Sequence, residues 1–585
     1  MTAKPKKAAR QPEVAAHQSA PQQETASSPR EPMLVFFAVL FIALAIRMVR
    51  FGSFGIWEDE GYTAMLISQP WHDFIYLMRF DSSPPVYYVL LKLWAGLFGM
   101  GEVSLKLPSL ILSLGALSGV YGAARRHFGG NVAAIAALLF AFSPMQVWYS
   151  HNFRYYALIE VIAAVSIGKV LDIGRSVETK SGVKASDLFW WALLMVLGFY
   201  THVLFAMAFV IQGAYILWMA LRRRHDVRRV LTTSGAVLVL CLPWIAPFIS
   251  QQRATLAYQT SLAAPKLGDY GRAVSDFLFL YAPHWASIWY FLPLAAILLI
   301  AVLGAWSRPG PRSARWFLFA SVLVPPIAAF GLALLFHQPL LFNRRYFIPS
   351  SIAMLMLAGV ALLDVEALFK RWFNVEWRIG GVKEILVVVL LGLNVLGLGY
   401  LYTAPFAMNR DWRSAAAYLH MREEDETAPH LLLLNMESAS NLTTYYANCF
   451  SYYWLRMPRD KELVRHWPAD RYIVSPDGPV GPNDVISTHF AAEGDAGWSY
   501  FAYSPPNVPF VSIPKVVRRD MARYGSTEVW FIYPLRFSGA TGIPVPIGHQ
   551  MLKYLPGRYM IRLSYQFDGV GMDCAVPIST VGKRQ

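Results

Sequence analysis

Three consecutive carboxylates, Glu58, Asp59 and Glu60, directly follow an apolar segment, residues 33–49, that is long enough to cross a bilayer. Acidic side chains are costly at the edge of the hydrocarbon, so they usually mark a working site there. A carboxylate in this position can act as a general base that takes a proton from an attacking hydroxyl group. The structural alternative is an interaction with a helix dipole. We expect the catalytic role for Asp59 first, with Glu60 beside it.

A second polar segment, Asp81-Ser82-Ser83-Pro84-Pro85, combines a turn with the start of a helix. Asp and Ser are favoured caps, and proline suits the first helical turn, so capping alone explains this spacing. The functional alternative is that exposed amides at the helix start hold a phosphate, which would place Asp81 among the substrate-binding residues.

A short polar turn, Ser150-His151-Asn152-Phe153-Arg154-Tyr155-Tyr156, separates two apolar segments. An arginine at this depth needs an anion, so Arg154 is expected to bind a phosphate or to form a salt bridge with Asp59 or Asp81. His151 is either a second proton carrier or, more simply, a hydrogen-bonding partner.

A paired basic motif, Asn343-Arg344-Arg345-Tyr346, falls on the side of the membrane where basic residues are disfavoured. An anionic partner is therefore expected, either a lipid-linked phosphate or ordinary anionic head groups. With the carboxylates, these arginines suit the transfer of a group from a phosphate-linked lipid to an acceptor. The arginines would stabilise the departing phosphate and the carboxylate would activate the nucleophile.

The composition indicates a membrane protein, so the elements that position these residues are expected to be membrane helices. Of the 585 residues, 55% are hydrophobic and 15% are charged, whereas a soluble chain carries about 25% charged residues. The mean hydropathy is +0.37. Eleven apolar segments are predicted to cross the membrane, at roughly 33–50, 105–123, 131–149, 155–172, 187–201, 203–221, 230–249, 286–306, 316–336, 347–366 and 384–404.

Basic clusters between these segments decide the orientation. With eleven crossings, clusters such as Arg222-Arg223-Arg224 fall on the side of the N-terminal tail, as the positive-inside rule requires. A crossing at residues 85–98 would turn them outward, so this segment, which contains Lys92, is predicted to lie along the interface as a helix. The same rule explains the net charge of +15 without nucleic acid. We therefore predict a multi-pass protein of the inner (plasma) membrane with a cytoplasmic N-terminus.

Three parts follow from this topology. Residues 1–32 are predicted to be a disordered cytoplasmic tail. Residues 33–404 form a transmembrane catalytic module, whose first outer loop, residues 51–104, carries juxtamembrane helices. Residues 405–585 are predicted to form an extracytoplasmic α/β domain.

The predicted outer domain mixes polar and apolar residues. A helix is expected from Arg413 to Arg422, and strands are expected at 430–435, 472–474, 529–533 and 559–565. Cys449 and Cys574 both lie in this domain, and a disulfide between them is one possibility that spacing leaves open.

The chain resembles the polyprenyl-phosphate-sugar glycosyltransferases of the GT-C fold, in particular the protein O-mannosyltransferases and aminoarabinose transferases of glycosyltransferase family thirty-nine. The resemblance is clearest over residues 33–175. It is carried by Trp57-Glu58-Asp59-Glu60-Gly61-Tyr62, Asp81-Ser82-Ser83-Pro84-Pro85-Val86-Tyr87-Tyr88, Glu102 with Leu105-Lys106-Leu107-Pro108-Ser109, Ser143-Pro144 and Arg154-Tyr155-Tyr156-Ala157-Leu158.

The resemblance implies a catalytic acidic residue in the first outer loop, at Asp59 with Glu60 beside it. It also implies a basic residue before the double proline, but Ser83 stands where the aminoarabinose transferases have a lysine. The donor phosphate is therefore left to Arg154, Arg344, Arg345 or Lys92. Substrate contacts are expected at Tyr62, Asp81, His151 and Tyr155.

The turn around His151 lacks the second carboxylate that some relatives carry, so we predict inversion at the sugar carbon without a bound metal or cofactor. The expected function is transfer of a sugar from a polyprenyl-phosphate donor to an envelope glycan, lipid or protein outside the cytoplasm. Two alternatives were weighed. A transporter or flippase for a lipid-linked sugar would show paired broken spans and charges at mid-membrane. A receptor with a membrane anchor would not need eleven spans.

Overall fold

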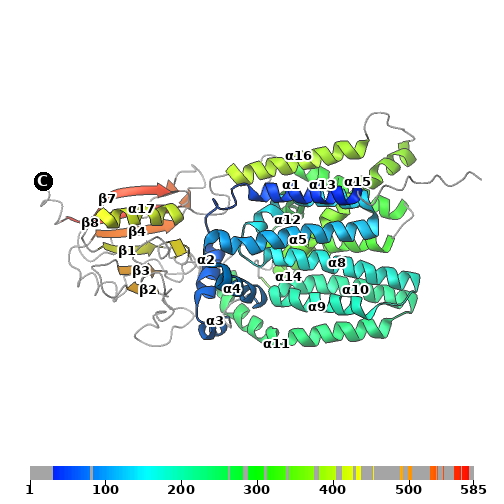
Figure 1. Ribbon diagram of the computed structural model, residues 1–585, viewed down its shortest axis with the longest axis horizontal. Coiled ribbons are helices and arrows are strands. Elements are labelled where there is room, and N and C mark those ends of the chain that lie inside the picture. The colour runs from blue at the N-terminus through cyan, green and yellow to red at the C-terminus, as the bar shows by residue number, and fades with distance from the viewer. Residues whose placement is uncertain are drawn as a thin grey trace, which may run out of the picture.

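The computed structural model describes the chain mainly from residue 31 to residue 425, and the outer domain in pieces. The described residues are 31–78, 83–260, 264–280, 287–307, 312–337, 342–373, 381–403, 412–425, 430–435, 449, 452–453, 488–491, 499–503, 528–534, 536–537, 544–545, 559–567 and 570–578. The predicted tail up to residue 30, Asp81 and the strand predicted at 472–474 lie outside them. A helical bundle and a β-sheet occupy opposite ends of the molecule, with three short helices between them (Figure 1).

The bundle consists of long helices that lie side by side, together with several short helical segments (Figure 1). They are α1 (Glu31–Met48), α5 (Glu102–Phe128), α6 (Gly130–Phe142), α7 (Pro144–Ser150), α8 (Tyr156–Thr179), α9 (Ala185–Thr201), η1 (Val203–Phe205), α10 (Ala206–Arg223), α11 (Val227–Thr260), α12 (Leu267–Phe279), α13 (Ser287–Ser307), α14 (Arg312–Leu335), η4 (Arg344–Phe347), α15 (Ile348–Phe373) and α16 (Val382–Thr403).

All eleven predicted apolar segments fall on helices, and the protein is a multi-pass membrane protein. Within the described ranges, six helices are long and apolar enough to cross a membrane, or seven if the bent pair α6–α7 counts as one span. The number of eleven crossings therefore stays a prediction. The bend of 60° between α6 and α7 lies at Ser143-Pro144. Proline at the first position of α7 starts a new helix there because it has no N–H to continue the preceding one.

α15 is the central helix of the bundle. In the membrane-length window that begins at Arg344, 83% of the residues are buried, the largest share among the candidate spans. η4 precedes this helix directly and carries Arg344 and Arg345. The paired arginines are thus attached to one of the most firmly packed elements of the molecule.

The first outer loop contains the three short helices that lie between the bundle and the sheet (Figure 1): α2 (Glu58–Ser68), α3 (Trp71–Leu77) and α4 (Val86–Phe98). The predicted helices of this loop, including the one at 85–98, are confirmed. α3 exposes the apolar side chains of Trp71, Ile75 and Tyr76. An exposed apolar face at the end of a membrane bundle suits an interfacial helix.

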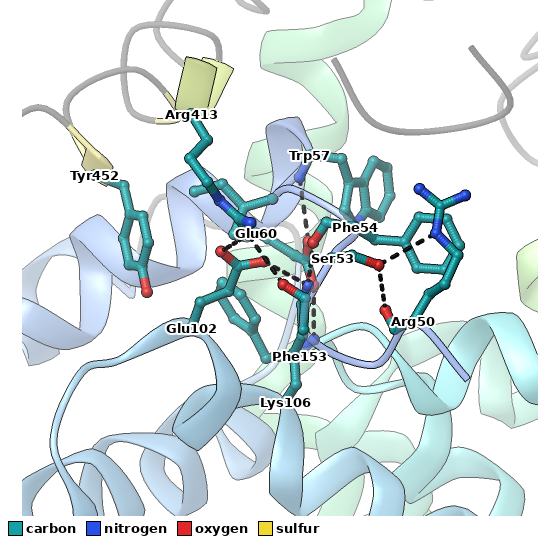
Figure 2. A network of polar contacts seen from close by, with 12 residues as sticks. Arg50, Ser53, Phe54, Trp57, Glu60, Glu102, Lys106, Phe153, Arg413 and Tyr452 are labelled. Atoms are coloured by element: carbon teal, nitrogen blue, oxygen red, sulfur yellow. Dashed lines mark hydrogen bonds and ion pairs between the residues drawn. The ribbon is translucent and has the colours of Figure 1, made fainter. Parts of the chain in front are cut away.

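Both ends of α2 are fixed by side-chain hydrogen bonds, from its own Glu60 at the start and from Lys92 of α4 at the end. At the start, Glu60 accepts hydrogen bonds from the backbone N–H groups of Trp57 (3.1 Å) and Phe153 (2.8 Å), as Figure 2 shows. At the end, the Lys92 ammonium donates to the carbonyls of Ile67 (2.8 Å) and Gln69 (2.5 Å). These contacts satisfy groups that a helix leaves open at its termini.

The outer domain is built on a six-stranded mixed sheet with the strand order β2-β3-β1-β4-β8-β7, accompanied by α17 (Trp412–Asp425). β1 is parallel to both β3 and β4, and the remaining pairs are antiparallel. The strands are β1 (His430–Asn435), β2 (Thr488–Ala491), β3 (Ser499–Tyr503), β4 (Glu528–Pro534), β7 (Tyr559–Phe567) and β8 (Val570–Pro577), with a separate hairpin of β5 (Arg536–Phe537) and β6 (Pro544–Val545).

The α/β character of this domain is confirmed, as are the helix from Arg413 and the strands predicted at 430–435, 529–533 and 559–565. The suggested disulfide is not formed. Cys449 and Cys574 are both buried, and neither is joined to another described cysteine. Each lies where packing alone accounts for its burial.

Glu60 generates a prediction about pH. Burial raises the pKa of its carboxyl group to about 8, although Lys106 and the two backbone N–H groups oppose the shift. A folded-state pKa above the unfolded value contributes stability at low pH that is lost as pH rises toward 8. We expect the melting temperature of the wild type to fall from pH 5 to pH 8.5, and Glu60→Gln to lose this dependence.

Thermal unfolding in detergent at both pH values measures this effect. Glu178→Gln is the control, because Glu178 is a partly exposed carboxylate in a 4.0 Å ion pair with Arg223 on α10. The same pH slope in wild type and Glu60→Gln would contradict the assignment.

Candidate active site

Asp59 lies between two arginines that come from distant parts of the chain. One carboxylate oxygen, Oδ2, is 2.9 Å from Nη1 of Arg345 and 3.8 Å from Nη2 of Arg154. The Asp59 side chain is 18% exposed, so it is accessible but largely shielded from water. The structure therefore brings together a carboxylate from α2, a guanidinium from the turn before α8 and a guanidinium from η4.

Aromatic rings connect the two arginines on the side away from Asp59. The Arg154 guanidinium lies 5.2 Å from the centre of the Tyr155 ring, and that of Arg345 lies 5.4 Å from the Tyr346 ring. His202 lies between the two tyrosines, 4.8 Å from each ring centre. The contacts close on themselves, and we call the set the Asp59 circuit. Its members are Asp59, Arg154, Tyr155, His202, Tyr346 and Arg345.

His202 adds no charge to the circuit. Burial, together with the nearby positive charges of Arg345 and Arg154, lowers the pKa of its imidazole to about 3. The neutral ring accepts a hydrogen bond at Nδ1 from the backbone N–H of Leu204 (3.3 Å). It can therefore stack between two tyrosines without repelling the arginines beside them.

Arg154 is held in place by hydroxyl groups. Its Nη1 donates to Thr63 Oγ1 and to the Tyr88 hydroxyl, both at 2.7 Å, and to the backbone carbonyl of Asp59 at 3.3 Å. Thr63 in turn donates to the same carbonyl at 2.8 Å. These contacts attach Arg154 to α2 one turn beyond Asp59, so the carboxylate and the guanidinium move as one unit.

The charges of the Asp59 circuit do not cancel. One carboxylate faces two guanidinium groups, and both arginine side chains are largely buried, 7% exposed for Arg154 and 28% for Arg345. Among the described residues, the Nε–H donors of both arginines have no acceptor. Buried donors of a charged group are normally satisfied, so this arrangement suits an additional anion between the two.

Arg344, the neighbour of Arg345, points to a different partner. Its Nη1 is 3.2 Å from Oδ2 of Asp276 on α12. The paired motif thus divides between two carboxylates: Arg345 joins the Asp59 circuit, while Arg344 ties η4 to α12. Phosphate binding by Arg344 stays a prediction, but it is not part of the circuit.

The other predicted site residues differ in how closely they are connected with the Asp59 circuit. Tyr155 is a member of the circuit. Tyr62 is half-buried on α2 and packs against the core. His151 is buried against the rings of Phe51 and Phe54, and burial lowers the pKa of its imidazole to about 3, which opposes a role as a proton carrier at neutral pH.

Glu60 and Lys92 have structural partners that the sequence did not reveal. Both oxygens of Glu60 accept backbone hydrogen bonds, so its position argues for a cap and against a second base. Lys92 binds the carbonyls at the end of α2 and lies over the rings of Trp71 and Phe74. We therefore leave both out of the reacting group. Asp81 lies outside the described residues.

Several members of the site were not identified from the sequence: Thr63, Tyr88, Tyr156, His202 and Tyr346. The Tyr156 hydroxyl accepts a hydrogen bond from Arg345 at 3.4 Å. The available signal was the repeated presence of tyrosine or histidine in the turns that the sequence predicted to lie on the outer side. Such residues pair well with arginine, but only the fold shows which turns meet.

A cavity lies beside the circuit on the bundle side of Tyr346. It is small, with a volume of about 20 Å³, and its walls include Met207, Ile211, Pro325 and Pro349. A mainly apolar space therefore lies next to the Asp59 circuit. As for metals, the described part of the chain has no group of three or more His, Cys, Asp or Glu side chains that could hold an ion. A metal-free reaction stays a prediction.

Comparisons with known proteins agree with this architecture. Residues 82–250 match the family model described as dolichyl-phosphate-mannose-protein mannosyltransferase. Two candidate mannosyltransferases of Bacillus subtilis (strain 168) are similar: YycA is 24% identical over 35% of this chain, and YkcB is 23% identical over 34%. The chain spans only 30% and 29% of the length of these relatives.

Solved structures match over a much larger part of the chain. ArnT from Cupriavidus metallidurans in the apo state is 16% identical, with a TM-score of 0.53, over 94% of this chain and 98% of ArnT. The same protein bound to undecaprenyl phosphate aligns with a TM-score of 0.49 and 16% identity, over 93% of this chain and 97% of ArnT. This protein therefore shares the membrane fold of ArnT across the chain, and its match to the mannosyltransferase family model is limited to residues 82–250.

Proposed function

We propose that this protein transfers a sugar from a polyprenyl-phosphate donor to an acceptor in the cell envelope, outside the cytoplasm, with inversion at the sugar carbon. The acceptor is a hydroxyl or phosphate group of a glycan, lipid or protein. Asp59 is the general base. The observation that carries the proposal is a partly exposed carboxylate flanked by two arginines whose positive charge it only half neutralises.

In the proposed reaction the acceptor hydroxyl attacks the anomeric carbon while its proton passes to the Asp59 carboxylate. The bond between that carbon and the phosphate oxygen breaks, and its electron pair stays on the polyprenyl phosphate. A single displacement of this kind inverts the configuration. Arg345 and Arg154 stabilise the charge of the departing phosphate, which is where a preorganised electrostatic contribution is most effective.

The ion pair between Asp59 and Arg345 has a consequence for this reaction. Oδ2 of Asp59 is occupied by the Arg345 guanidinium at 2.9 Å, so an acceptor hydroxyl must replace that donor to reach the carboxylate. We propose that the donor phosphate draws Arg345 away from Asp59 when it binds, so that the base is released only when a leaving group is present.

The family match supports the donor class, since its description names a polyprenyl-phosphate sugar, dolichyl-phosphate mannose. Which sugar this chain uses is best found with a panel of undecaprenyl-phosphate sugars, including mannose and 4-amino-4-deoxyarabinose, added to membranes that contain the full-length protein. Movement of a lipid-linked sugar across the bilayer without any transfer product would instead favour a transporter. Such a protein is expected to have paired broken spans, whereas the described helices include one bent pair, α6–α7.

Asp59→Asn tests the base. The amide has the same shape and can still accept a hydrogen bond from Arg345, so the fold and undecaprenyl phosphate binding are expected to persist. Transfer is expected to fall by about 100-fold or more, because general-base catalysis contributes at least that factor. The measurements are initial rates of sugar transfer and the affinity for undecaprenyl phosphate.

The matched control for this variant is Asp172→Asn. Asp172 pairs with Arg126 and His127 near the C-terminal ends of α5 and α8, at the other end of the bundle from Asp59. It should leave transfer unchanged. Turnover like that of the wild type in Asp59→Asn would refute the role of Asp59.

Arg345→Ala tests the phosphate site, with Arg344→Ala as a control from the same motif. Removing Arg345 deletes a charged hydrogen-bond donor from the Asp59 circuit, and undecaprenyl phosphate should bind about 10-fold to 100-fold more weakly. Removing Arg344 breaks its contact with Asp276, which lies outside the Asp59 circuit, and should change the affinity far less. Titration of each variant with undecaprenyl phosphate in nanodiscs gives the comparison. Equal weakening in the two variants would show that Arg345 has no special part in binding.

A further inference from the structure

Asp59 follows a short connection between α1 and α2. Among the polar contacts that hold the backbone of this connection, three come from side chains in later parts of the chain. The Lys106 ammonium donates to the carbonyl of Phe54 (2.5 Å). Arg413 Nη2 donates to the carbonyl of Gly52 (3.2 Å), and the backbone N–H of Ile56 donates to the Tyr453 hydroxyl (2.8 Å). Two of these three contacts come from the outer domain, which follows the bundle in the sequence.

Glu102, at the start of α5, connects the same groups to one another (Figure 2). Its Oε1 is 2.7 Å from Lys106. Its Oε2 accepts from Arg413 at 2.6 Å and from the Tyr453 hydroxyl at 2.9 Å. One carboxylate therefore divides its two oxygens between the bundle and the outer domain. We call Glu102, Lys106, Arg413 and Tyr453 the docking cluster.

The docking cluster is partly sheltered from water, which makes its contacts more than surface ion pairs. The side chain of Lys106 is 1% exposed and that of Glu102 is 11% exposed, whereas Arg413 is 40% exposed. Lys106 and Glu102 would neutralise each other without Arg413. Loss of Arg413 therefore leaves no buried charge unpaired, and the bundle should still fold.

The outer domain also packs directly on α2. A Cβ atom at Gly61 would lie 2.7 Å from both the backbone nitrogen and the sulfur of Cys449, so glycine is required for this approach. Gly61 is two residues after Asp59 on the same helix. A neighbouring contact, from the Tyr452 hydroxyl to the carbonyl of Met100 (2.9 Å), fixes the segment before α5.

We propose that Arg413 and Tyr453 are positioning residues for Asp59, and that the outer domain is thereby a working part of the active site. They act through the backbone of residues 52–56 and through Glu102. In this way they fix the position of α2, which carries Asp59, relative to Arg345. The inference rests on the proposed role of Asp59. A displacement of about 1 Å at a reacting group can cost up to about 100-fold in rate, so a loosened connection is expected to lower turnover before it affects donor binding.

The experiment uses the full-length protein and three variants: Arg413→Ala, Arg413→Lys and Tyr453→Phe. Arg126→Ala is the matched control, because it removes an arginine–carboxylate pair of the same 2.6 Å length between α5 and α8, away from the outer domain. Two properties are measured. The first is hydrogen–deuterium exchange in peptides that cover residues 52–61. The second is sugar transfer from undecaprenyl-phosphate mannose, as maximal rate and half-saturating concentration.

Arg413→Ala and Tyr453→Phe are expected to exchange faster over residues 52–61 and to lower the maximal rate by about 10-fold or more, with the half-saturating concentration within about twofold of the wild type. Arg413→Lys keeps the charge opposite Glu102 and should recover part of both properties. Arg126→Ala should behave as the wild type in both. Tyr453→Phe serves as the second variant if Arg413→Ala folds poorly.

Unchanged exchange over residues 52–61 in both Arg413→Ala and Tyr453→Phe would overturn the inference, whatever the activity. Faster exchange with an unchanged maximal rate would also overturn it, because the connection would then be mobile without consequence for Asp59. These outcomes differ from failure of the proposed function, in which Asp59→Asn itself retains full turnover.

Discussion

The site depends on one interaction: the Asp59 carboxylate is held between two arginines at the end of the helical bundle that faces the β-sheet. Placing two guanidinium groups in partly dry surroundings is unfavourable unless anions accompany them. Asp59 supplies one negative charge against the two positive charges of Arg154 and Arg345. The remaining positive charge gives the site its preference for an anionic group, and a phosphate that joins a lipid to a sugar is such a group.

The elements around this interaction fix the positions of the three charged groups. α15 supports Arg345 from the centre of the bundle. Thr63 and Tyr88 hold Arg154 against α2. α2 itself is fixed at its start by Glu60, at its end by Lys92 and near its middle by close contact with the outer domain. Because these supports come from different parts of the chain, the site exists only when the bundle and the first outer loop are assembled.

Two residues that look catalytic in the sequence prove to have partners that favour structural roles. Glu60 stands beside Asp59 in the chain, but consecutive residues on a helix point about 100° apart, so the side chain of one faces the circuit while the other turns to the backbone of Phe153. Lys92 is a basic residue near the double proline, yet it closes the end of α2. Both side chains have chemistry that suits the reaction, but they point to their structural partners and not to the Asp59 circuit.

The sequence by itself determined the membrane class, the helices of the bundle, the helices of the first outer loop and the α/β character of the outer domain. It could do so because hydropathy, periodicity and capping are local properties of the chain. It also identified Asp59, Arg154 and Arg345 as residues of interest, since a charged residue beside an apolar segment can be recognised from the sequence alone. Only the tertiary structure decided that Arg345 and not Arg344 faces Asp59, that His202 completes the circuit and that Glu102 joins the outer domain to α5. Those pairings depend on side-chain direction and on contacts between segments up to several hundred residues apart, which no local pattern records.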